Sequence, residues 1–539
     1  MFLFILLLIL PTKSNLLNIQ NKHESKGMSK KAPQIIEIES VIPKKSGFTH
    51  TENWIHIDGN WTLTNKTYDW CYGKGTWEEP FIIENVSIDA SSSPTGCGIF
   101  INNSKNTYFI IRNCTVENSP MSATPWENAG IKLQNTNNGT IFNNTCVNNQ
   151  RRGILLYSNC DSNNITENIS NNNEAGINLH VDCNDNIITN NTLNYNEYRG
   201  LHITVCNDNI ITNNTANNNK NDGIYITSNC NFSIIANNTA NNNKDDGITI
   251  AGIYNNITGN IANNNIGDGI VSGSDYSNIT GNTANNNSNG IIISSSIGCT
   301  IAHNTANNNT ANGIWLNYDC DGNTIVENTA KHNNIGIYVY SSNDNKIMGN
   351  TANNNTDGIG LNGGYYNTIS SNTANNNTRN GISLGGTWYT QISRNDASFN
   401  GDNGIYLIDA WDTEIINNVE SIANNGYCGI YLYKSSQNTI TGNYIYNNVK
   451  YGICLNQSNN NDVYGNVFYG NGQNIFNNGT DNRFTGPESE DNGDGSTKYT
   501  GSPTALILMI FFIFVVAGIA LIIIFKKKRK SSIVRTSEP

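Results

Sequence analysis

The chain has 539 residues, a formal net charge of −11 and a hydrophobic fraction of 37%. The acidic balance disfavours nucleic-acid binding, which relies on Lys and Arg to neutralise phosphate groups. Asparagine makes up roughly a fifth of the residues, far above ordinary usage, which argues against several conventional globular domains. One repeated architecture with a narrow core explains this composition better.

The N-terminal part of the chain is predicted to direct secretion. The apolar run Met1–Leu10 is too short to span a bilayer, and residues 1–14 are typical of a signal peptide. Because no Lys or Arg precedes the run, an uncleaved anchor and a mis-set start codon are the alternatives. A polar linker is predicted over 15–33 and an N-terminal cap with the first coils over 34–97.

The C-terminal part is predicted to anchor the chain. The uninterrupted apolar run 505–525 has about the 20 residues that a transmembrane helix needs. The basic residues that follow predict a cytoplasmic tail over 526–539 by the positive-inside rule. Residues 485–504, rich in Gly, Ser, Asp and Glu, are predicted to form a flexible stalk. We therefore expect a single-pass protein of the cell membrane whose ectodomain is extracellular.

Residues 98–484 are a tandem repeat of about 23 residues, marked by Gly-Ile-x-Leu or Gly-Ile-x-Ile. This repeat is shorter than helical-pair repeats and propeller blades, and Asn-rich sequence with short β-branched runs forms poor helices. The pattern predicts an all-β fold, a right-handed parallel β-helix with an N-terminal cap and a C-terminal transmembrane helix. The repeat glycines are Gly98, Gly130, Gly153, Gly176, Gly200, Gly223, Gly247, Gly269, Gly290, Gly313, Gly336, Gly358, Gly381, Gly404, Gly429 and Gly452.

Each coil is predicted to contain two strands. Side chains one and three residues after the repeat glycine should point inward, because side chains alternate along a strand. A second strand carries Ile-x-x-Asn, and its asparagines should stack in a ladder whose amides bond to one another and to nearby backbone. The predicted ladder contains Asn191, Asn214, Asn238, Asn260, Asn282, Asn304, Asn328, Asn350, Asn372, Asn395, Asn443 and Asn466.

Cysteines follow the same register. Cys160, Cys183, Cys206, Cys230 and Cys320 each lie five residues before the isoleucine of the second strand. Neighbouring coils are about 4.8 Å apart, which allows disulfides in an oxidising compartment. Stacked free thiols fit the pattern equally well. A metal site fits less well, since a linear column does not provide tetrahedral ligands.

The segments Ile55–Asn60 (Ile-His-Ile-Asp-Gly-Asn) and Gly73–Phe81 (Gly-Lys-Gly-Thr-Trp-Glu-Glu-Pro-Phe) resemble the start of archaeal cell-surface β-helix proteins. The repeats after them resemble the NosD and carbohydrate-binding/sugar-hydrolysis (CASH) β-helix superfamily. The resemblance implies a first partial coil that caps the core, pinned by a Cys71–Cys97 disulfide. It also implies functions as different as carbohydrate-active enzymes, adhesive surface proteins and copper-site assembly, so it does not settle the activity.

Aromatic residues at outward strand positions of the later coils form a candidate glycan-binding stripe. Flat rings beside amides suit the apolar faces of sugars, although aromatic residues also favour strand surfaces for structural reasons. The candidates are Trp315, Tyr338, Tyr340, Tyr406, Tyr431 and Tyr433.

Two weaker candidate sites lie in the earlier coils. His180 and His202 take outward positions on adjacent turns and, with Asp182, form a candidate metal site, the alternative being solvated strand residues. The residue before the repeat glycine gives the column Arg199, Asp222, Asp246 and Asp268, which resembles what a uronate lyase or glycosidase uses. Asn replaces Asp at this position in later coils, which an Asx turn before a strand explains equally well.

Three sequons are candidate glycosylation sites, and the methionines bear on copper binding. Asn190, Asn213 and Asn237 lie in Asn-Asn-Thr sequons one residue before the ladder and should face solvent, so we predict glycosylation there. The methionines are scattered and no histidine pair lies beside one, which disfavours copper handling. No cofactor and no bound metal are expected.

The expected function is that of a non-enzymatic surface protein. The near-constant repeat leaves little room for the long loops that usually build a catalytic cleft on such a fold. We expect it to bind glycans or neighbouring surface proteins, and to contact the membrane through one helix. A cell-tethered polysaccharide lyase or glycoside hydrolase is the alternative.

Overall fold

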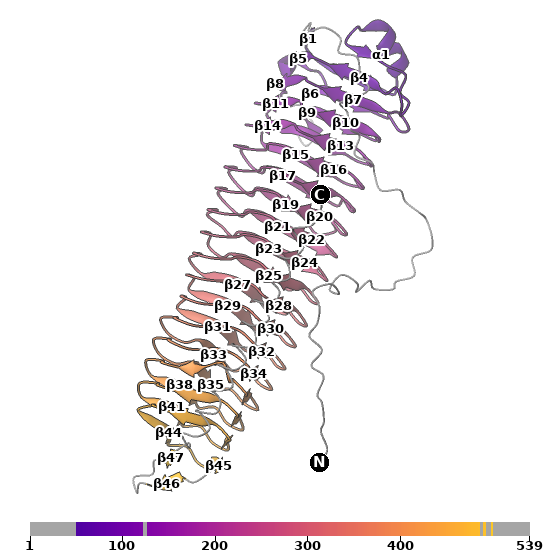
Figure 1. Ribbon diagram of the computed structural model, residues 1–539. Helices are drawn as coiled ribbons and strands as arrows, with labels where there is room; N and C mark the ends of the chain where they lie inside the picture. The colour runs from indigo at the N-terminus through magenta and orange to yellow at the C-terminus, as the bar shows by residue number, and fades with distance from the viewer. Residues whose placement is uncertain (1–49, 122–126, 486–488, 492–496, 500–539) are drawn as a thin grey trace, which may run out of the picture. The chain divides into compact units, whose positions relative to one another are not determined.

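The computed structural model describes residues 50–121, 127–485, 489–491 and 497–499. They form an all-β parallel solenoid of about 16 coils, in which successive strands stack along the chain (Figure 1). Among these residues no helix is long and apolar enough to cross a membrane. The predicted signal peptide, transmembrane span and cytoplasmic tail lie outside the described residues.

Sheet I contains the Gly-Ile-x-Leu strands. Its parallel strands pair in chain order, and the register places equivalent repeat positions side by side, as in Ile224↔Ile248. The strands are β2 (Ile55–Asp58), β6 (Cys97–Asn102), β9 (Ala129–Gln134), β12 (Arg152–Tyr157), β15 (Ala175–His180), β17 (Leu201–Thr204), β19 (Ile224–Ile226), β21 (Ile248–Ile253), β23 (Ile270–Asp275), β25 (Ile291–Ser294), β27 (Asn312–Asn317), β29 (Ile335–Tyr340), β31 (Asp357–Asn362), β33 (Ile382–Gly385), β35 (Ile405–Ile408), β38 (Cys428–Tyr433), β41 (Tyr451–Asn456) and β44 (Gln473–Asn477).

Sheet II contains the second strand of each coil, as predicted. Its first member, β4, also pairs antiparallel with β3 (Cys71–Tyr72). The parallel strands are β4 (Phe81–Glu84), β7 (Phe109–Arg112), β10 (Gly139–Phe142), β13 (Asn164–Thr166), β16 (Ile187–Thr189), β18 (Ile210–Thr212), β20 (Ile234–Ala236), β22 (Asn256–Thr258), β24 (Asn278–Thr280), β26 (Thr300–Ala302), β28 (Thr324–Val326), β30 (Lys346–Met348), β32 (Thr368–Ser370), β34 (Gln391–Ser393), β36 (Glu414–Ile416), β39 (Thr439–Thr441), β42 (Asp462–Tyr464) and β45 (Arg483–Thr485).

Sheet III is a third side of the coil that the repeat pattern did not predict. In the middle coils it is reduced to single parallel bridges, from Ile169↔Thr192 to Asp396↔Ser421. Its strands are β1 (His50–Glu52), β5 (Val86–Asp89), β8 (Thr115–Glu117), β11 (Thr145–Val147), β14 (Ile169–Asn171), β37 (Ile422–Ala423), β40 (Tyr444–Tyr446) and β43 (Val467–Tyr469). After the last coil β46 (Ser489–Asp491) and β47 (Thr497–Tyr499) form a short antiparallel pair.

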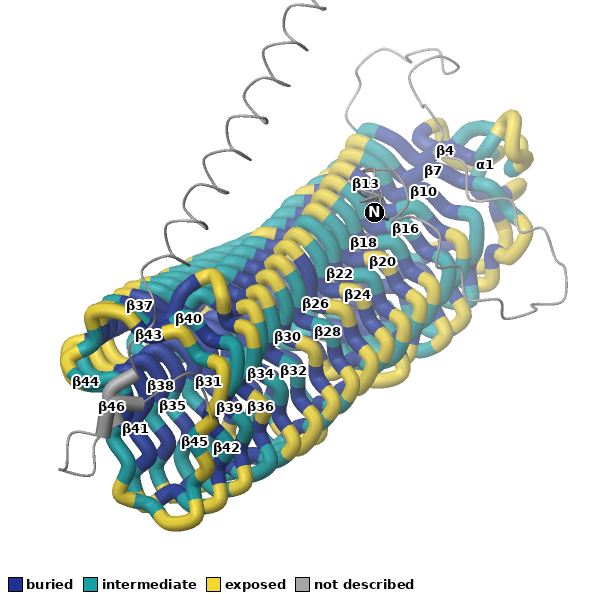
Figure 2. Tube along the Cα trace, turned by 60° about the horizontal axis from the view of Figure 1, so that its bottom comes forward, coloured by how far each residue is buried: buried dark blue, intermediate teal, exposed yellow. Residues whose placement is uncertain are grey.

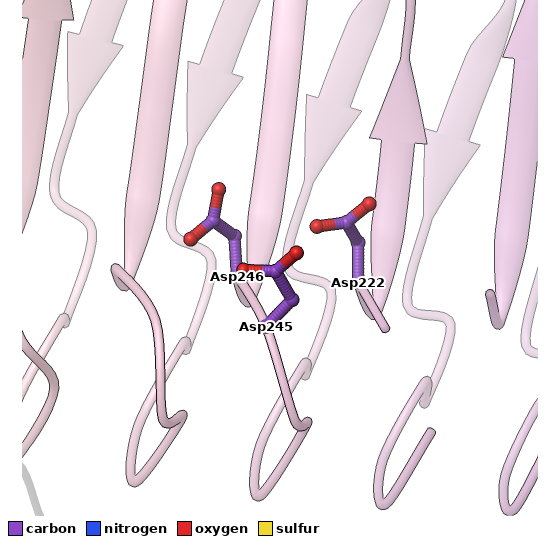
Figure 3. A group of neighbouring side chains, drawn as sticks. All are labelled: Asp222, Asp245 and Asp246. Carbon is purple, nitrogen blue, oxygen red and sulfur yellow. The ribbon is translucent and has the colours of Figure 1, made fainter. Parts of the chain in front are cut away.

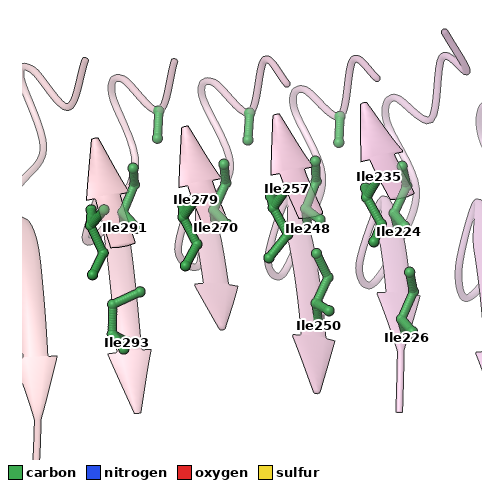
Figure 4. Close-up of a cluster of buried hydrophobic side chains, with 14 of the residues drawn as sticks. Ile224, Ile226, Ile235, Ile248, Ile250, Ile257, Ile270, Ile279, Ile291 and Ile293 are labelled. Atoms are coloured by element: carbon green, nitrogen blue, oxygen red, sulfur yellow. The ribbon is translucent and has the colours of Figure 1, made fainter. Parts of the chain in front are cut away.

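The core is a set of stacked aliphatic columns. Ile224 and Ile226 of sheet I and Ile235 of sheet II are at most 1% exposed, and their equivalents in neighbouring coils lie directly beside them (Figure 4). The inward positions one and three residues after the glycine are thus confirmed. Exposed residues gather in rows along the turns (Figure 2). Each buried isoleucine contributes roughly 1.5–3 kcal/mol relative to an exposed one, so the stack is stabilised coil by coil.

The asparagine ladder is confirmed. The side-chain amide of each ladder residue donates to the next, for example Asn214 Nδ2 to Asn238 Oδ1 at 3.0 Å. Asn418 fills the gap that the prediction left between Asn395 and Asn443. A second ladder, beginning at Asn149, was not predicted and follows the sheet III segments in the same way. Both ladders satisfy amides that would be costly to bury unpaired.

The N-terminal end of the core is closed by α1 (Trp61–Thr67). Trp61 is 3% exposed, its ring stacks on Phe81 and Phe109 at 5.2 and 5.0 Å, and its Nε1 donates to Ser104 Oγ at 2.9 Å. The short 3-10 helix Ala90–Ser92 follows β5. The resemblance implied a first partial coil as the cap, and the structure places a short α-helix there, which shields core side chains from water.

Cysteine pairing was not as the resemblance implied. Cys71 and Cys97 are both free and lie in different sheets, in β3 and β6, so the implied disulfide is absent. Cys160, Cys183, Cys206 and Cys230 are also free and buried, which selects stacked thiols from the two alternatives. Burial raises the pKa of Cys160 and of Cys230, which keeps these thiols protonated and unreactive.

Candidate functional site

The outer face of sheet I carries an open pocket of about 440 Å³ in the later coils. Its residues occupy three repeat positions: two residues before the glycine, one before it, and two after it. They are Arg379, Asn380, Asp402, Asn403, Tyr406, Tyr427 and Tyr431, which we call the tyrosine pocket. Two of the six predicted stripe residues, Tyr406 and Tyr431, therefore lie in it.

The rings of the tyrosine pocket are tilted and not stacked flat. Tyr406 and Tyr431 have centroids 5.4 Å apart with planes at 42°, and Tyr427 and Tyr431 are 5.9 Å apart at 57°. Ring faces consequently remain open toward the pocket. Tyr431 Oη accepts a hydrogen bond from Asn456 Nδ2 at 2.9 Å. Burial raises the pKa of Tyr406 and of Tyr431, so both phenols stay protonated and can donate as well as accept.

Polar groups line the rim of the pocket. The Arg379 guanidinium pairs with the buried carboxylate of Asp357, with Nε 3.2 Å from Oδ1, while its side chain remains 57% exposed. Asp402 is exposed, and Asn403 donates to Asn380 through Nδ2 at 2.9 Å. The arrangement offers hydrogen-bond donors and acceptors around aromatic faces, which is the composition of a site for a polar ligand with apolar patches.

The other four predicted stripe residues lie outside the tyrosine pocket. Trp315 and Tyr338 stack at 6.4 Å, and Tyr338 is 6.1 Å from Tyr340. Trp315 Nε1 is buried without a partner. Tyr433 lies under the Lys434 ammonium, which is 5.2 Å from its ring centroid. Trp315, Tyr338 and Tyr340 form a separate patch on β27 and β29, whereas Tyr433 lies on β38, the strand of Tyr431.

Aromatic stacks on the turn between sheets I and II were missed, because only strand positions were inspected for aromatic residues. Tyr365, Trp388 and Trp411 stack at 5.1 and 5.3 Å on consecutive coils. A similar stack, with centroids 5.4 and 5.3 Å apart, contains Phe232, Tyr254 and Tyr276. Their planes are within 20° of parallel, so neighbouring rings cover one another's faces. This geometry favours a structural role over sugar stacking.

Two residues of the predicted column before the repeat glycine, Asp222 and Asp246, lie in a cluster of three carboxylates with Asp245, which the prediction did not include (Figure 3). Oxygen atoms of Asp222, Asp245 and Asp246 lie within 4.8 Å of one another, the one set of three or more His, Cys, Asp or Glu found this close in the described ranges. Asp246 Oδ1 accepts from the Asp268 amide at 2.7 Å and Oδ2 from Thr249 at 3.1 Å. Asp246 thus accepts from the backbone of the next coil, as Asp268 Oδ1 does from the Asn289 amide, and not from its own turn as the Asx explanation requires.

Burial raises the pKa of Asp246 from 3.8 to about 6, and the carboxylates of Asp268, Asp222 and Asp245 add to the shift. The folded state therefore binds this proton more tightly than the unfolded state, and stability falls as pH rises from about 4 to about 6. We expect Asp246→Asn to raise the free energy of unfolding by about 1–2 kcal/mol at pH 7, after allowance for solvent screening, and not at pH 4. Urea unfolding at both pH values checks this, with exposed Asp344→Asn as control; an equal effect at both pH values would refute the assignment.

The histidines of the candidate metal site lie on adjacent strands but are offset by two residues. The register places His202 opposite Asn178 and His180 opposite Thr204. His180 stacks on Tyr157 at 5.7 Å, and Asp182 is an exposed turn residue with φ of 53°. The three residues proposed from the sequence thus lie in different places: His180 at the end of β15, His202 within β17 and Asp182 in a turn.

The predicted glycosylation sites are exposed, as expected from the register. Asn190, Asn213 and Asn237 each occupy a left-handed turn position, with φ of 55–57°, next to the buried ladder residue. A glycan attached to Nδ2 there would project away from the core. We expect glycosylation in the native protein, detected by mass spectrometry of glycopeptides. Finding all three unmodified would contradict the prediction.

Comparisons of the sequence with protein families agree with the β-helix fold. The family described as "Right handed beta helix region" matches residues 54–203 and 169–306, and "Periplasmic copper-binding protein (NosD)" matches residues 321–501. The fold and these matches define a right-handed β-helix repeat protein. More particularly, the chain is a NosD-like β-helix repeat protein. No curated protein sequence matches the chain.

Several solved β-helix structures are distantly similar. The Dettilon tailspike protein (gp208) is 17% identical over 56% of this chain and 58% of its own, with a TM-score of 0.37. The A-module of the Azotobacter vinelandii mannuronan C-5 epimerase AlgE4 is 13% identical over 75% and 89%, with a TM-score of 0.21. The PL6 family alginate lyase AlyGC is 10% identical over 74% and 80%, with a TM-score of 0.32. The chain thus spans little more than half of the tailspike.

Copper binding, which the NosD family description names, does not fit the residues described here. Copper sites favour clustered Met, His and Cys. Cys183 and Cys206 are buried and their Sγ atoms lie close to backbone carbonyl oxygens, at 3.5 Å from His180 O and 3.1 Å from Thr204 O. The group with convergent ligand atoms consists of carboxylates, which are hard ligands.

Proposed function

We propose that this chain is a non-catalytic glycan-binding protein displayed at the cell surface. The observation that carries the proposal is the tyrosine pocket on the outer face of sheet I. Its volume of about 440 Å³ lies within the range of small-ligand sites, and it combines three aromatic rings with amide and charged groups. Sugars present both apolar faces and hydroxyl groups, so they match this lining.

Ring geometry supports the tyrosine pocket over the turn stacks as the binding surface. A sugar stacks on the face of a ring, and the faces in the Tyr365, Trp388 and Trp411 stack are largely covered by neighbouring rings. Tyr406 and Tyr431 are tilted and keep open faces. Their phenols and the nearby amides supply hydrogen bonds that fix the orientation of the ligand.

Display at the surface rests on the sequence. The N-terminal apolar run predicts export, and the apolar run 505–525 with its basic flank predicts a single membrane span. With the solenoid outside, sheet I faces glycans of the cell's surroundings. Neighbouring surface proteins that carry glycans would bind to the same pocket through their sugars.

A tethered polysaccharide lyase or hydrolase is the second candidate, and one observation favours it. The pKa of Asp246 is raised to about 6, and the carboxylates of Asp222 and Asp245 lie beside it. Glycan-cleaving enzymes use neighbouring carboxyl groups with different pKa values, one as the general acid and one as the general base. Two observations argue against catalysis. Asp222 forms an ion pair with Arg199, and Asp246 accepts hydrogen bonds from the Asp268 backbone amide and the Thr249 hydroxyl.

One experiment separates the two candidates. The full-length protein is presented to a glycan array, and each bound polysaccharide is then incubated with it and analysed for new chain ends. Binding without new ends is the expected result. New ends that disappear in Asp246→Asn would establish the enzymatic alternative and overturn the binding-only proposal.

A further inference from the structure

The outer side of sheet II carries no charged residue over seven successive strands, from β16 to β28, which lie side by side (Figure 2). In each strand the middle residue points into the core and its two neighbours point outward, as β20 shows with Ile235 between Ile234 and Ala236. The surface, which we call the neutral face, ends at Lys346 of β30. Its outward residues are Ile187, Thr189, Ile210, Thr212, Ile234, Ala236, Asn256, Thr258, Asn278, Thr280, Thr300, Ala302, Thr324 and Val326.

An aromatic stack borders the centre of the neutral face. Phe232, Tyr254 and Tyr276 each lie two residues before a strand of this face, and they are 53%, 47% and 49% exposed. Ile297, which is 39% exposed, lies before the next strand of the face. A monomeric protein rarely exposes a contiguous apolar surface of this kind, and such surfaces mark interaction sites.

The charge around this stack is low. Asp275 borders it, and the Asp275 Oδ1 atom accepts a hydrogen bond from the Ile297 amide at 3.0 Å. The stack that ends at Trp411 differs, because Asp409 and Asp412 lie within two residues of that ring in the sequence. The neutral face and its stack are therefore distinct from the other exposed rings of the same turn.

Polar groups of the neutral face bond to one another. Asn278 Nδ2 donates to Asn256 Oδ1 at 3.0 Å, and Thr258 Oγ1 donates to the same oxygen at 2.7 Å. Thr212 Oγ1 donates to Thr189 Oγ1 at 3.1 Å. A polar group that already has a partner costs less to remove from water than an unpaired one. Burial of this face against another protein surface is consequently less costly than its Asn and Thr content alone indicates.

We infer that two copies of this chain associate through the neutral face, with sheet II of one copy packed on sheet II of the other. Two chains of net charge −11 repel each other, so a surface without charge is where they approach at the lowest cost. The strands repeat at about 4.8 Å in both copies, so the rows of outward side chains have the same spacing and interdigitate as in face-to-face sheets.

The neutral face is large enough for a specific dimer. Its seven strands extend over about 34 Å, and each strand is about 10 Å long. A half-exposed aromatic ring adds about 100 Å². The area buried is on the order of 600 Å² per copy and about 1,200 Å² in total, which is the lower end for specific interfaces. The tyrosine pocket lies on sheet I and stays outside this interface.

The predicted glycosylation sites are compatible with this dimer. Asn190, Asn213 and Asn237 follow the strands of the neutral face, whereas the aromatic stack precedes them. The sites and the stack therefore lie at opposite edges of sheet II, and glycans would flank the interface.

The test is sedimentation velocity of the full-length protein in detergent at concentrations from roughly 1 to roughly 100 μM. We expect a monomer–dimer equilibrium with a Kd of roughly 10 μM, because the interface is small. Ile234→Glu places like charges in the centre of the interface and should leave the protein monomeric at every concentration. Thr368→Glu introduces the same residue at the same repeat position of β32, beyond the neutral face, and should leave the Kd unchanged.

A second variant guards against misfolding. Ile234→Asn introduces the residue that β22 and β24 carry at this position, so the melting temperature should not change, while the dimer should weaken about tenfold. A wild-type protein that is monomeric at the highest concentration would overturn the inference. A dimer with the wild-type Kd in both Ile234 variants would place association elsewhere, for example in the apolar run 505–525, and would also overturn it. So would equal weakening by Ile234→Glu and Thr368→Glu.

Discussion

Asn238→Leu is expected to destabilise the solenoid by about 3–5 kcal/mol, although leucine is more hydrophobic and of similar size. Asn238 Nδ2 donates to Ile211 O at 2.8 Å and to Asn260 Oδ1 at 3.0 Å, and its Oδ1 accepts from Asn214 N and Nδ2. Leucine would leave these buried groups unpaired on both sides of the ladder. Urea unfolding followed by circular dichroism measures the loss.

The effect should be local at first, because each coil contacts only its neighbours. Hydrogen exchange should therefore increase in the coils that contain Asn214, Asn238 and Asn260 before it increases elsewhere. Asn278→Leu is the matched control, since Asn278 is an exposed residue on the outer side of β24. Equal destabilisation by the two variants would show that ladder hydrogen bonds are not what stabilises these coils.

The second large effect is expected on binding. Tyr406→Ala and Tyr431→Ala should each weaken binding of the array-selected glycan about tenfold, since a stacked ring face contributes roughly 1 kcal/mol beyond its buried area. Both side chains are only partly buried and point away from the core, so the melting temperature should change little. Titration calorimetry with the purified full-length protein measures the affinity.

The matched control for the tyrosine pocket is Tyr389→Ala. Tyr389 is an equally large ring, 49% exposed, on the turn between sheets I and II, where it stacks on Tyr366. Its removal should leave affinity unchanged. A loss of binding in Tyr389→Ala with none in Tyr406→Ala would move the site from sheet I to the turn.

Much of the fold could be predicted because the repeat pattern reports packing directly. The glycine and the two inward aliphatic residues identified sheet I, and Ile-x-x-Asn identified sheet II with its ladder. Sheet III was missed because its segments carry Thr and small residues, and in the middle coils it consists of single bridges without an apolar pattern. The second ladder was missed for the same reason, although its asparagines recur at the same interval, from Asn149 to Asn173 and on to Asn196.

The candidate site was predicted only in part. Tyr406 and Tyr431 were found because outward strand positions were inspected. Arg379, Asp402 and Tyr427 were missed because they lie two residues before a repeat glycine, in the turn, where side-chain direction does not follow strand alternation. The signal was present, since all three occupy the same repeat position on consecutive coils. Cysteine pairing could not be predicted, because stacked thiols and disulfides require the same register.

The most direct test of the account is a crystal structure of the protein with the glycan selected by the array. The account predicts a sugar ring against the faces of Tyr406 and Tyr431, with hydroxyl groups bonded to Asp402 or to the neighbouring asparagines. A glycan bound instead on the stack of Tyr365, Trp388 and Trp411, or on sheet II, would contradict it.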